Sequence, residues 1–289
     1  MKPRGPDFFI VGAPKCGTTT LFRYLAQHPQ VYVSPRKEPH FFCDEPPPHF
    51  RPIGVDAYHR LFADAGPHLM AGEASTNYLY SATACSRIHE YSPHARVLVI
   101  LRDPADRTYS EYWHFRRYGM EALTFDACIA EDDARDPHRR YIARGFYSHH
   151  VERYQRTFGA DGVHVLLLDD LRDDALTACS RVLTFLGVSA RSDGPVATAE
   201  GVGWTPRWRG AGSSYSGLIG PQSWAARVSR KALPRSLGRA GRRAAHRLLT
   251  RPGVPQMSAG TRARLRAFYA QEIDRLESVI ARDLGGWRQ

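Results

Sequence analysis

The run GAPKCGTTT at residues 12–20 has the residue types and spacing of an anion-binding loop. It follows an apolar stretch, residues 8–11, and it precedes residues 18–28, where apolar side chains recur at helical spacing. Backbone N–H groups in such a loop and the positive end of the following helix attract phosphate or sulfate. Lys15 adds a positive charge and the threonines add hydroxyl donors. The run therefore predicts a site for a phosphate or sulfate group.

The loop differs from the Walker A sequence of nucleoside-triphosphate enzymes, GxxxxGK[ST]. Gly12 and Gly17 have the right spacing, but Thr18 stands where that sequence needs a lysine, and the lysine lies inside the loop at position 15. We find no convincing acidic strand end for magnesium, because Asp169-Asp170 follows the loop by about 150 residues. A P-loop kinase or NTPase is disfavoured but stays an alternative.

A second anion site is predicted after residues 97–101 (VLVIL), the clearest strand pattern in the sequence. Arg102 follows this strand, and α/β sheets bind ligands in the crevice beyond the carboxyl ends of their strands. Ser110 comes eight residues later, about two turns into the expected helix. A guanidinium and a hydroxyl together suit a phosphate monoester. The alternative is a surface salt bridge from Arg102 to Asp103 or Asp106.

Residues 35–42 (PRKEPHFF) contain a carboxylate that suits proton transfer. Arg36 and Lys37 precede Glu38, and an apolar pair follows His40. Such a carboxylate can be drawn partly out of water and act as a general base. The alternative is a solvated Glu38 paired with Lys37 or Arg36.

These residues need a scaffold, and strand and helix patterns alternate along the chain. The pattern predicts an α/β protein, a P-loop-like three-layer fold with a central, mainly parallel sheet flanked by helices. No boundary divides the chain cleanly, so we expect a single domain over residues 1–289, with an irregular basic segment at 189–257. We expect strands at 8–11, 31–33, 69–73, 97–101 and 163–168, and helices at 18–28, 105–117, 125–131, 145–158, 171–186 and 258–284.

The charge of the chain is concentrated in one segment. The formal net charge is +11, and residues 205–251 hold eleven Lys and Arg residues and no Asp or Glu. Such a segment favours an anionic partner, which could be a phosphate-rich cofactor, nucleic acid or a membrane surface, or it is a solubilising face. Five widely spaced cysteines without a CxxC pair indicate a reducing compartment. No apolar run reaches 18 residues and no signal peptide is evident, so we expect a cytoplasmic protein without a membrane span.

Three motifs together carry a resemblance that covers nearly the whole chain. PKCGTTTL after FFIVGA, KEPHFF, and LRDP followed by Arg107 and Ser110 resemble the sulfotransferases that use 3′-phosphoadenosine-5′-phosphosulfate (PAPS), in the bacterial branch related to heparan-sulfate-type domains. The resemblance implies an enzyme of class EC 2.8.2 that moves a sulfuryl group from PAPS to a hydroxyl of a small acceptor, releases 3′-phosphoadenosine-5′-phosphate (PAP) and needs no metal. It assigns the cofactor to Lys15, Cys16, Gly17, Thr18, Thr19, Thr20, Arg102, Ser110, Tyr147, Arg207 and Arg209.

The resemblance also implies catalytic roles. Glu38 becomes the general base, Lys15 stabilises the leaving group, and His40 is the reserve candidate for the base. The expected substrate residues are Lys37, His40, Glu73 and Ser75.

Two departures from the family pattern bear on the acceptor. Ala74 stands where heparan enzymes carry a lysine for sulfated sugar, and Cys43 comes before Asp44 where relatives have an acid directly after HFF. The first departure argues against a polyanionic glycan. It favours a natural product, a saccharide or a lipid as the acceptor.

A nucleic-acid-binding protein is the remaining alternative, on the strength of the basic segment. It leaves Lys15, Glu38 and Arg102 without roles, and the segment has no recognised nucleic-acid-reading motif. We therefore expect a small-molecule acceptor and no nucleic acid. The sequence leaves the oligomeric state open and permits a homodimer.

Overall fold

The structure, a computed structural model, describes residues 5–47, 50–51, 53–67, 69–189, 204–206 and 248–289. Contacts within it group the chain into two compact units. The first unit comprises residues 1–107, 144–200 and 266–289, and the second comprises residues 108–143 and 201–265. The expectation of a single domain stays a prediction.

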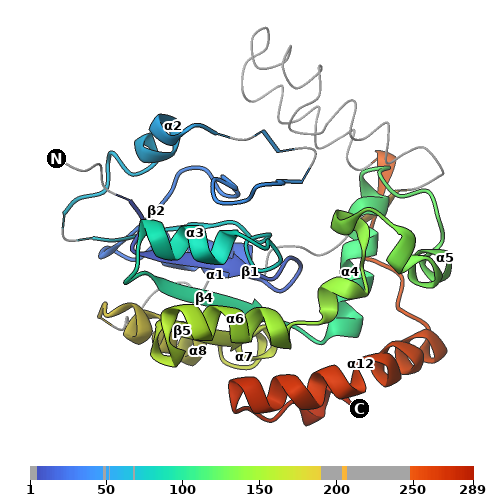
Figure 1. Cartoon of the computed structure of the whole chain (residues 1–289). Helices are drawn as coiled ribbons and strands as arrows, with labels where there is room; N and C mark the ends of the chain where they lie inside the picture. Colours follow the sequence, from blue (N-terminus) through green and yellow to red (C-terminus); the bar gives the residue numbers. More distant parts are fainter. Residues whose placement is uncertain (1–4, 48–49, 52, 68, 190–203, 207–247) are drawn as a thin grey trace, which may run out of the picture. The chain divides into compact units, whose positions relative to one another are not determined.

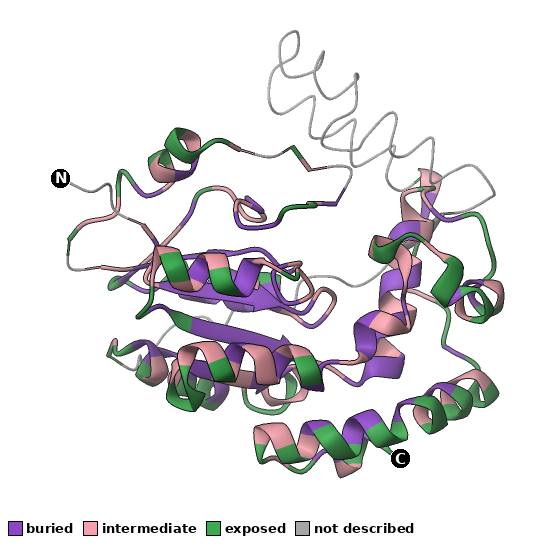
Figure 2. Cartoon of the chain, viewed as in Figure 1, coloured by how far each residue is buried: buried purple, intermediate pink, exposed green. Residues whose placement is uncertain are grey.

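The first unit is built on five parallel strands in the order β2-β3-β1-β4-β5 (Figure 1). This confirms the predicted α/β fold with a parallel sheet flanked by helices. β1 is buried at every residue, as Figure 2 shows, because side chains on both faces of a central parallel strand are covered. The strands are β1 (Phe8–Gly12), β2 (Val31–Val33), β3 (Met70–Ala74), β4 (Arg96–Leu101) and β5 (Val163–Leu167).

Helices cover this sheet according to the direction in which the chain crosses it. From β1 the chain crosses β3 to reach β2, and from β3 it returns across β1 to reach β4. Because parallel crossovers are right-handed, α1 lies on the opposite face from α3 and α6. α3 and α6 pack on each other, and α6 also packs on β4 and β5. The helices of this unit include α1 (Thr18–Leu25), α2 (Val55–Arg60), α3 (Ala84–Tyr91), α6 (Ser148–Phe158), α7 (Leu168–Asp173) and α8 (Ala175–Leu186).

Three helical features differ from the sequence prediction. The pattern at 171–186 predicts one helix, but α7 and α8 are separate because the Asp174 side chain accepts the Thr177 N–H at 3.1 Å and begins a new helix. α6 begins at Ser148, whose N–H and hydroxyl both donate to the Glu272 carboxylate of α12 (Ala259–Ile280), at 2.7 and 2.9 Å. Neither α2 nor α3 was predicted.

The second unit holds the remaining described elements. α4 (Pro104–Arg117) and α12 each cross the boundary between the units. α5 (Phe125–Ala130) and a short antiparallel pair, β6 (Trp204–Pro206) with β7 (Thr250–Pro252), lie wholly within it. Most of the predicted basic segment lies outside the described residues. Among the helices that the structure describes, none combines the length and apolar composition needed to cross a bilayer.

Gly72 supplies a stability test for the packing of β1 on β3. It pairs with Phe8, and a Cβ atom added there would lie 2.3 Å from the Phe8 ring, which is fully buried. We expect Gly72→Ala to lower the free energy of unfolding by about 1–3 kcal/mol through overpacking, as measured by guanidinium unfolding. Gly54→Ala is the matched control, because nothing lies within 4 Å of that Cβ position. Equal stability of the two variants would contradict this packing.

Candidate functional site

The anion loop leaves the carboxyl end of β1 and turns into α1. Lys15 and Gly17 have left-handed backbone, with φ of 69° and 95°. Gly17 begins α1, and a Cβ atom there would lie 2.8 Å from Leu168, so glycine is required for two reasons. Gly17 offers no side chain to cap α1, and the first turn of this helix has no acidic residue. The positive end of the helix is thus left for an anion.

Hydrogen bonds hold this loop between the two neighbouring strands of the sheet. The Ala13 N–H donates to the Ile100 carbonyl of β4 at 2.8 Å. On the other side, the chain that follows β3 is bonded to the end of β1, directly before the loop. The Ser75 N–H donates to the Ile10 carbonyl at 3.1 Å, and the Leu79 N–H donates to the Val11 carbonyl at 2.8 Å. The loop therefore lies between the ends of β3 and β4. Each of those ends carries a predicted site residue.

Glu38 reaches this edge from the segment after β2. Its backbone N–H donates to the Ala74 carbonyl at 2.8 Å, which ties the segment to the end of β3. Its Oε1 lies 2.7 Å from Lys37 Nζ and accepts the Thr76 hydroxyl at 3.1 Å. Its Oε2 accepts the Thr76 N–H at 2.9 Å and lies 3.3 Å from His40 Nε2. The Glu38 side chain keeps 17% of its surface exposed, whereas His40 keeps 1%, so Glu38 is the more accessible base.

These contacts set the ionisation of Glu38. Burial raises the pKa of this carboxyl, but the positive charge of Lys37, then His40, and the hydrogen bonds from Lys37 and the Thr76 N–H outweigh it and leave the pKa below its usual value. Glu38 is therefore a carboxylate at neutral pH, ready to accept a proton. The ion pair between Glu38 and Lys37, which was the alternative interpretation, is present. Both side chains are mostly buried and not solvated as that alternative assumed.

Glu73 and Ser75 were predicted as substrate residues, and that role stays a prediction. Both are fully buried, and the Glu73 carboxylate accepts hydrogen bonds from Ser75, Tyr58 and Tyr78 at 2.8 to 2.9 Å. Neighbouring groups of the protein thus enclose both side chains. Burial raises the pKa of Glu73 to about 7, although the three hydroxyl bonds lower it. The segment from Ser75 to Tyr80 is braced from α6 as well, where Tyr154 and Arg153 donate to the carbonyls of Tyr78 and Leu79.

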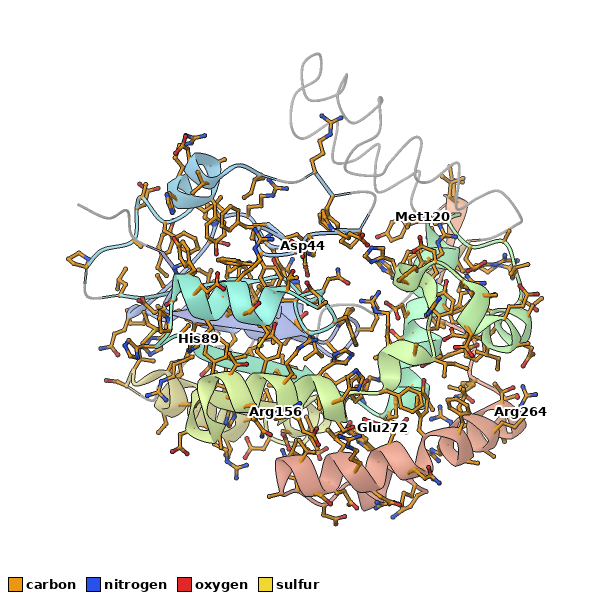
Figure 3. All side chains as sticks on the ribbon, viewed as in Figure 1. Asp44, His89, Met120, Arg156, Arg264 and Glu272 are labelled. Atoms are coloured by element: carbon orange, nitrogen blue, oxygen red, sulfur yellow. The ribbon has the colours of Figure 1, made fainter. Side chains whose placement is uncertain are left out.

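Asp44, which Figure 3 labels, fixes the chain that follows Glu38. Asp44 accepts a hydrogen bond from Arg87 of α3 at 2.7 Å and another from Thr83. Arg87 also donates to the Phe42 carbonyl at 3.3 Å. The acid that is displaced by one position relative to the family pattern thus anchors the segment to α3.

Arg102 lies at the end of β4, beside the anion loop. Its Nη2 lies 3.5 Å from Asp106, so the salt bridge that was the alternative interpretation is present. Its Nε is buried and has no hydrogen-bond partner among the described residues, whereas the side chain as a whole keeps 18% of its surface exposed. Tyr147 was predicted to contact the cofactor, but it is fully buried, and its hydroxyl donates to the Arg102 carbonyl at 3.1 Å. Asp103 begins α4 and pairs with Arg266.

The predicted site residues are brought together only in part. The first unit gathers the anion loop, Arg102 and the segment with Lys37, Glu38 and His40 at one edge of its sheet. Ser110 lies on the part of α4 that belongs to the second unit, so its predicted role stays a prediction. Arg207 and Arg209 lie outside the described residues. Within the described ranges, no group of three or more His, Cys, Asp or Glu side chains is placed to hold a metal ion.

Thr76 and the two tyrosines on Glu73 were missed at the sequence level. Thr76 lies 38 residues after Glu38, and no spacing rule links them. The available signal is the polar run Ser75-Thr76-Asn77, which comes just after the predicted strand at 69–73. Tyr58 lies on α2, a helix of six residues that is too short to show a clear period.

Comparison with known proteins gives one consistent result. The family model described as "Sulfotransferase domain" matches residues 5–199. The bifunctional heparan sulfate N-deacetylase/N-sulfotransferase 4 of Mus musculus is 30% identical over 201 residues, which cover 64% of this chain and 22% of that protein. The chain therefore matches less than a quarter of the length of this curated relative.

Solved structures agree. A sulfotransferase from Alicyclobacillus acidocaldarius has a TM-score of 0.75 and 30% identity, over 99% of this chain and 100% of that one. The sulfotransferase domain from the curacin biosynthetic pathway has a TM-score of 0.51 and 14% identity, over 68% and 81% of the two chains, and shows likeness of fold alone.

The charge of Lys37 supplies a test of the Glu38 environment. Lys37→Met removes the nearest positive charge, so we expect the pKa of Glu38 to rise, as measured by NMR titration of the labelled carboxyl carbon. Arg36→Met is the control, because the Arg36 guanidinium donates to the Arg51 carbonyl and not to Glu38. An unchanged pKa in Lys37→Met, or the same rise in both variants, would contradict the described pairing.

Proposed function

The chain belongs to the sulfotransferase domain family, and we propose that it transfers the sulfuryl group of PAPS to a hydroxyl of a small acceptor. The observation that carries the proposal is the position of the anion loop, between the ends of β3 and β4. That position supports binding of one end of a doubly phosphorylated nucleotide between Arg102 and the Glu38 carboxylate. Lys15 and Arg102 follow the neighbouring parallel strands β1 and β4, which supports contact of one nucleotide with both.

The residues of this chain fit the donor. The N–H groups at the start of α1 and Lys15 supply positive charge for a 5′-phosphosulfate, with Cys16, Gly17, Thr18, Thr19 and Thr20 as loop donors. The partly exposed guanidinium of Arg102 supplies donors for the 3′-phosphate. When bound, PAPS would supply a sulfuryl group joined through a bridging oxygen to its 5′-phosphate.

Proton transfer and charge stabilisation then fall to two residues. Glu38 accepts the proton of the acceptor hydroxyl while the new S–O bond forms. Lys15 stabilises the negative charge that grows on the bridging oxygen as the old S–O bond breaks, and PAP leaves with that electron pair. Lys37 and His40 keep Glu38 ionised before the transfer. His40 is the reserve base.

The acceptor is proposed only by class. Ala74 is fully buried at the end of β3 and provides no charge where heparan enzymes carry a lysine. We therefore favour an uncharged or weakly charged acceptor, such as a natural product, a saccharide or a lipid. Catalysis without a metal, action in the cytoplasm and the absence of a nucleic-acid partner remain predictions.

Isothermal titration with PAP and with ATP tests the proposal. We expect PAP to bind with or without magnesium and at least tenfold more tightly than ATP, because two anion sites match its two phosphate-bearing ends. Tighter binding of ATP that depends on magnesium would favour a P-loop kinase or NTPase instead.

Lys15→Ala should weaken both PAP binding and turnover. Loss of one charge-assisted contact corresponds to about 10–100-fold in affinity. Binding is measured by the same titration, and turnover by transfer from sulfur-35-labelled PAPS to a panel of a phenol, a long-chain alcohol and an unsulfated disaccharide. Unchanged PAP affinity would remove Lys15 from the donor site.

Glu38→Gln should leave PAP affinity within about twofold while lowering turnover about 10²–10⁴-fold, because it keeps the shape of the side chain and removes the base. Glu45→Gln, an exposed acid on the same segment, is the control and should retain activity. Full activity in Glu38→Gln would assign the base to His40 or another residue.

A further inference from the structure

Glu73 is a fully buried carboxylate for which the proposed reaction has no use. It lies one residue before the end of β3, and no described cation pairs with it. Its partners are three hydroxyl groups, of which Tyr58 and Tyr78 donate to Oε1 and Ser75 donates to Oε2. Burial of an ionisable group without a counter-ion is costly. Such a group calls for a role that an apolar residue could not fill.

Two of the three hydroxyls connect Glu73 to the base segment, residues 38–42. Ser75 Oγ accepts the backbone N–H of His40 at 3.0 Å, and the Tyr78 hydroxyl accepts that of Phe42 at 3.3 Å. A carboxylate only accepts hydrogen bonds, so it directs both hydroxyl hydrogens toward itself. The lone pairs of the two hydroxyls are then free for the two backbone N–H groups.

The base segment needs such support because its backbone is unfavourable. Glu38 and His40 both have left-handed φ, at 58° and 53°. Non-glycine residues in this region carry a conformational cost, and they stay there only when their surroundings hold them. The two N–H groups that end on the Glu73 network are those of His40 itself and of Phe42, two residues further on.

We propose that Glu73 is a positioning residue, which holds the base segment in its active conformation through the Ser75 and Tyr78 hydroxyls. The inference rests on the proposed function in one respect, the assignment of Glu38 as the base. Replacement of the carboxylate by an amide would reverse part of the network, because an NH₂ group donates where the oxygen accepted. The Glu38 carboxylate would then lose its fixed position while the anion loop stays intact.

The same network makes the position of Glu38 depend on pH. Protonated Glu73 must donate its own hydrogen to one of the three hydroxyls, which weakens the hold on the segment. The pKa of Glu73 is about 7, so this protonation takes place near neutral pH. Other titratable groups around Glu73 keep their charge in this pH range. Burial raises the pKa of Cys43 to about 12 and raises the pKa of three tyrosines, Tyr58, Tyr78 and Tyr154, well above its usual value, so these four groups stay neutral. Glu38 stays ionised because its pKa is lowered. His40 also faces the network, through its backbone.

Tyr78→Phe and Tyr58→Phe form a matched pair for the test. Both hydroxyls donate to the same oxygen at 2.9 Å from buried rings, but only the Tyr78 hydroxyl bonds the base segment. We expect Tyr78→Phe and Glu73→Gln to lower the kcat for transfer to the best acceptor of the panel at least tenfold at pH 8.5, with KM for PAPS and PAP affinity within about twofold. Tyr58→Phe should keep kcat within about threefold at that pH.

The pH profile and amide exchange separate positioning from a loss of fold. Tyr58→Phe removes a bond that lowers the pKa of Glu73, so its acid-side inflection in kcat should move to higher pH, whereas Glu73→Gln should lose that inflection. Hydrogen exchange at the Phe42 amide should speed up at least tenfold in Tyr78→Phe but not in Tyr58→Phe.

Several results would overturn the inference. The first is a Glu73→Gln variant with the kcat and pH profile of the parent protein. The second is an equal kcat in Tyr78→Phe and Tyr58→Phe. The second result overturns the inference even if Glu73→Gln does not fold. If Glu38→Gln is inactive and Tyr78→Phe is fully active, only this inference fails. If Glu38→Gln is fully active, the base assignment fails first, and the inference falls with it.

Discussion

Parallel pairing of β1 with both β3 and β4 is the constraint from which the site follows. Three strands that run the same way end at the same edge, so the segments after them must crowd together there. The crossovers leave β1 toward one face and β3 and β4 toward the other, which opens space beside the anion loop. Arg102 lies on one side of this loop, and the turn that binds Glu38 lies on the other.

Two carboxylates near that edge have opposite electrostatic surroundings. Glu38 has a lysine ammonium at 2.7 Å and a backbone N–H donor, and its pKa is lowered. Glu73 has only hydroxyl donors and no exposed surface, and its pKa is raised to about 7. Because of this difference in surroundings, Glu38 is ionised at neutral pH whereas the pKa of Glu73 lies near neutral pH. In the roles proposed above, Glu38 accepts a proton and Glu73 holds Glu38 in place.

Much of the fold was predictable because its signals are local. The apolar runs at 8–11 and 97–101 and the loop at 12–20 are short, contiguous and flanked by turn residues, and the structure confirms both strands. The proposed roles of Lys15 and Glu38 came from motifs of a few residues. The burial of Glu73 was not predicted, because a motif does not report burial. Thr76 was missed because its bond to Glu38 exists only once β1 and β3 pair.

The structure of the protein crystallised with PAP would test the central claim most directly. The account predicts that the 5′-phosphate lies in the loop after β1 within hydrogen-bonding distance of Lys15 Nζ, that the 3′-phosphate contacts Arg102, and that the Glu38 carboxylate faces the 5′ end. A nucleotide bound with its 5′-phosphate away from this loop, or one that reaches the loop but leaves Glu38 on the far side of the strand edge, would contradict it.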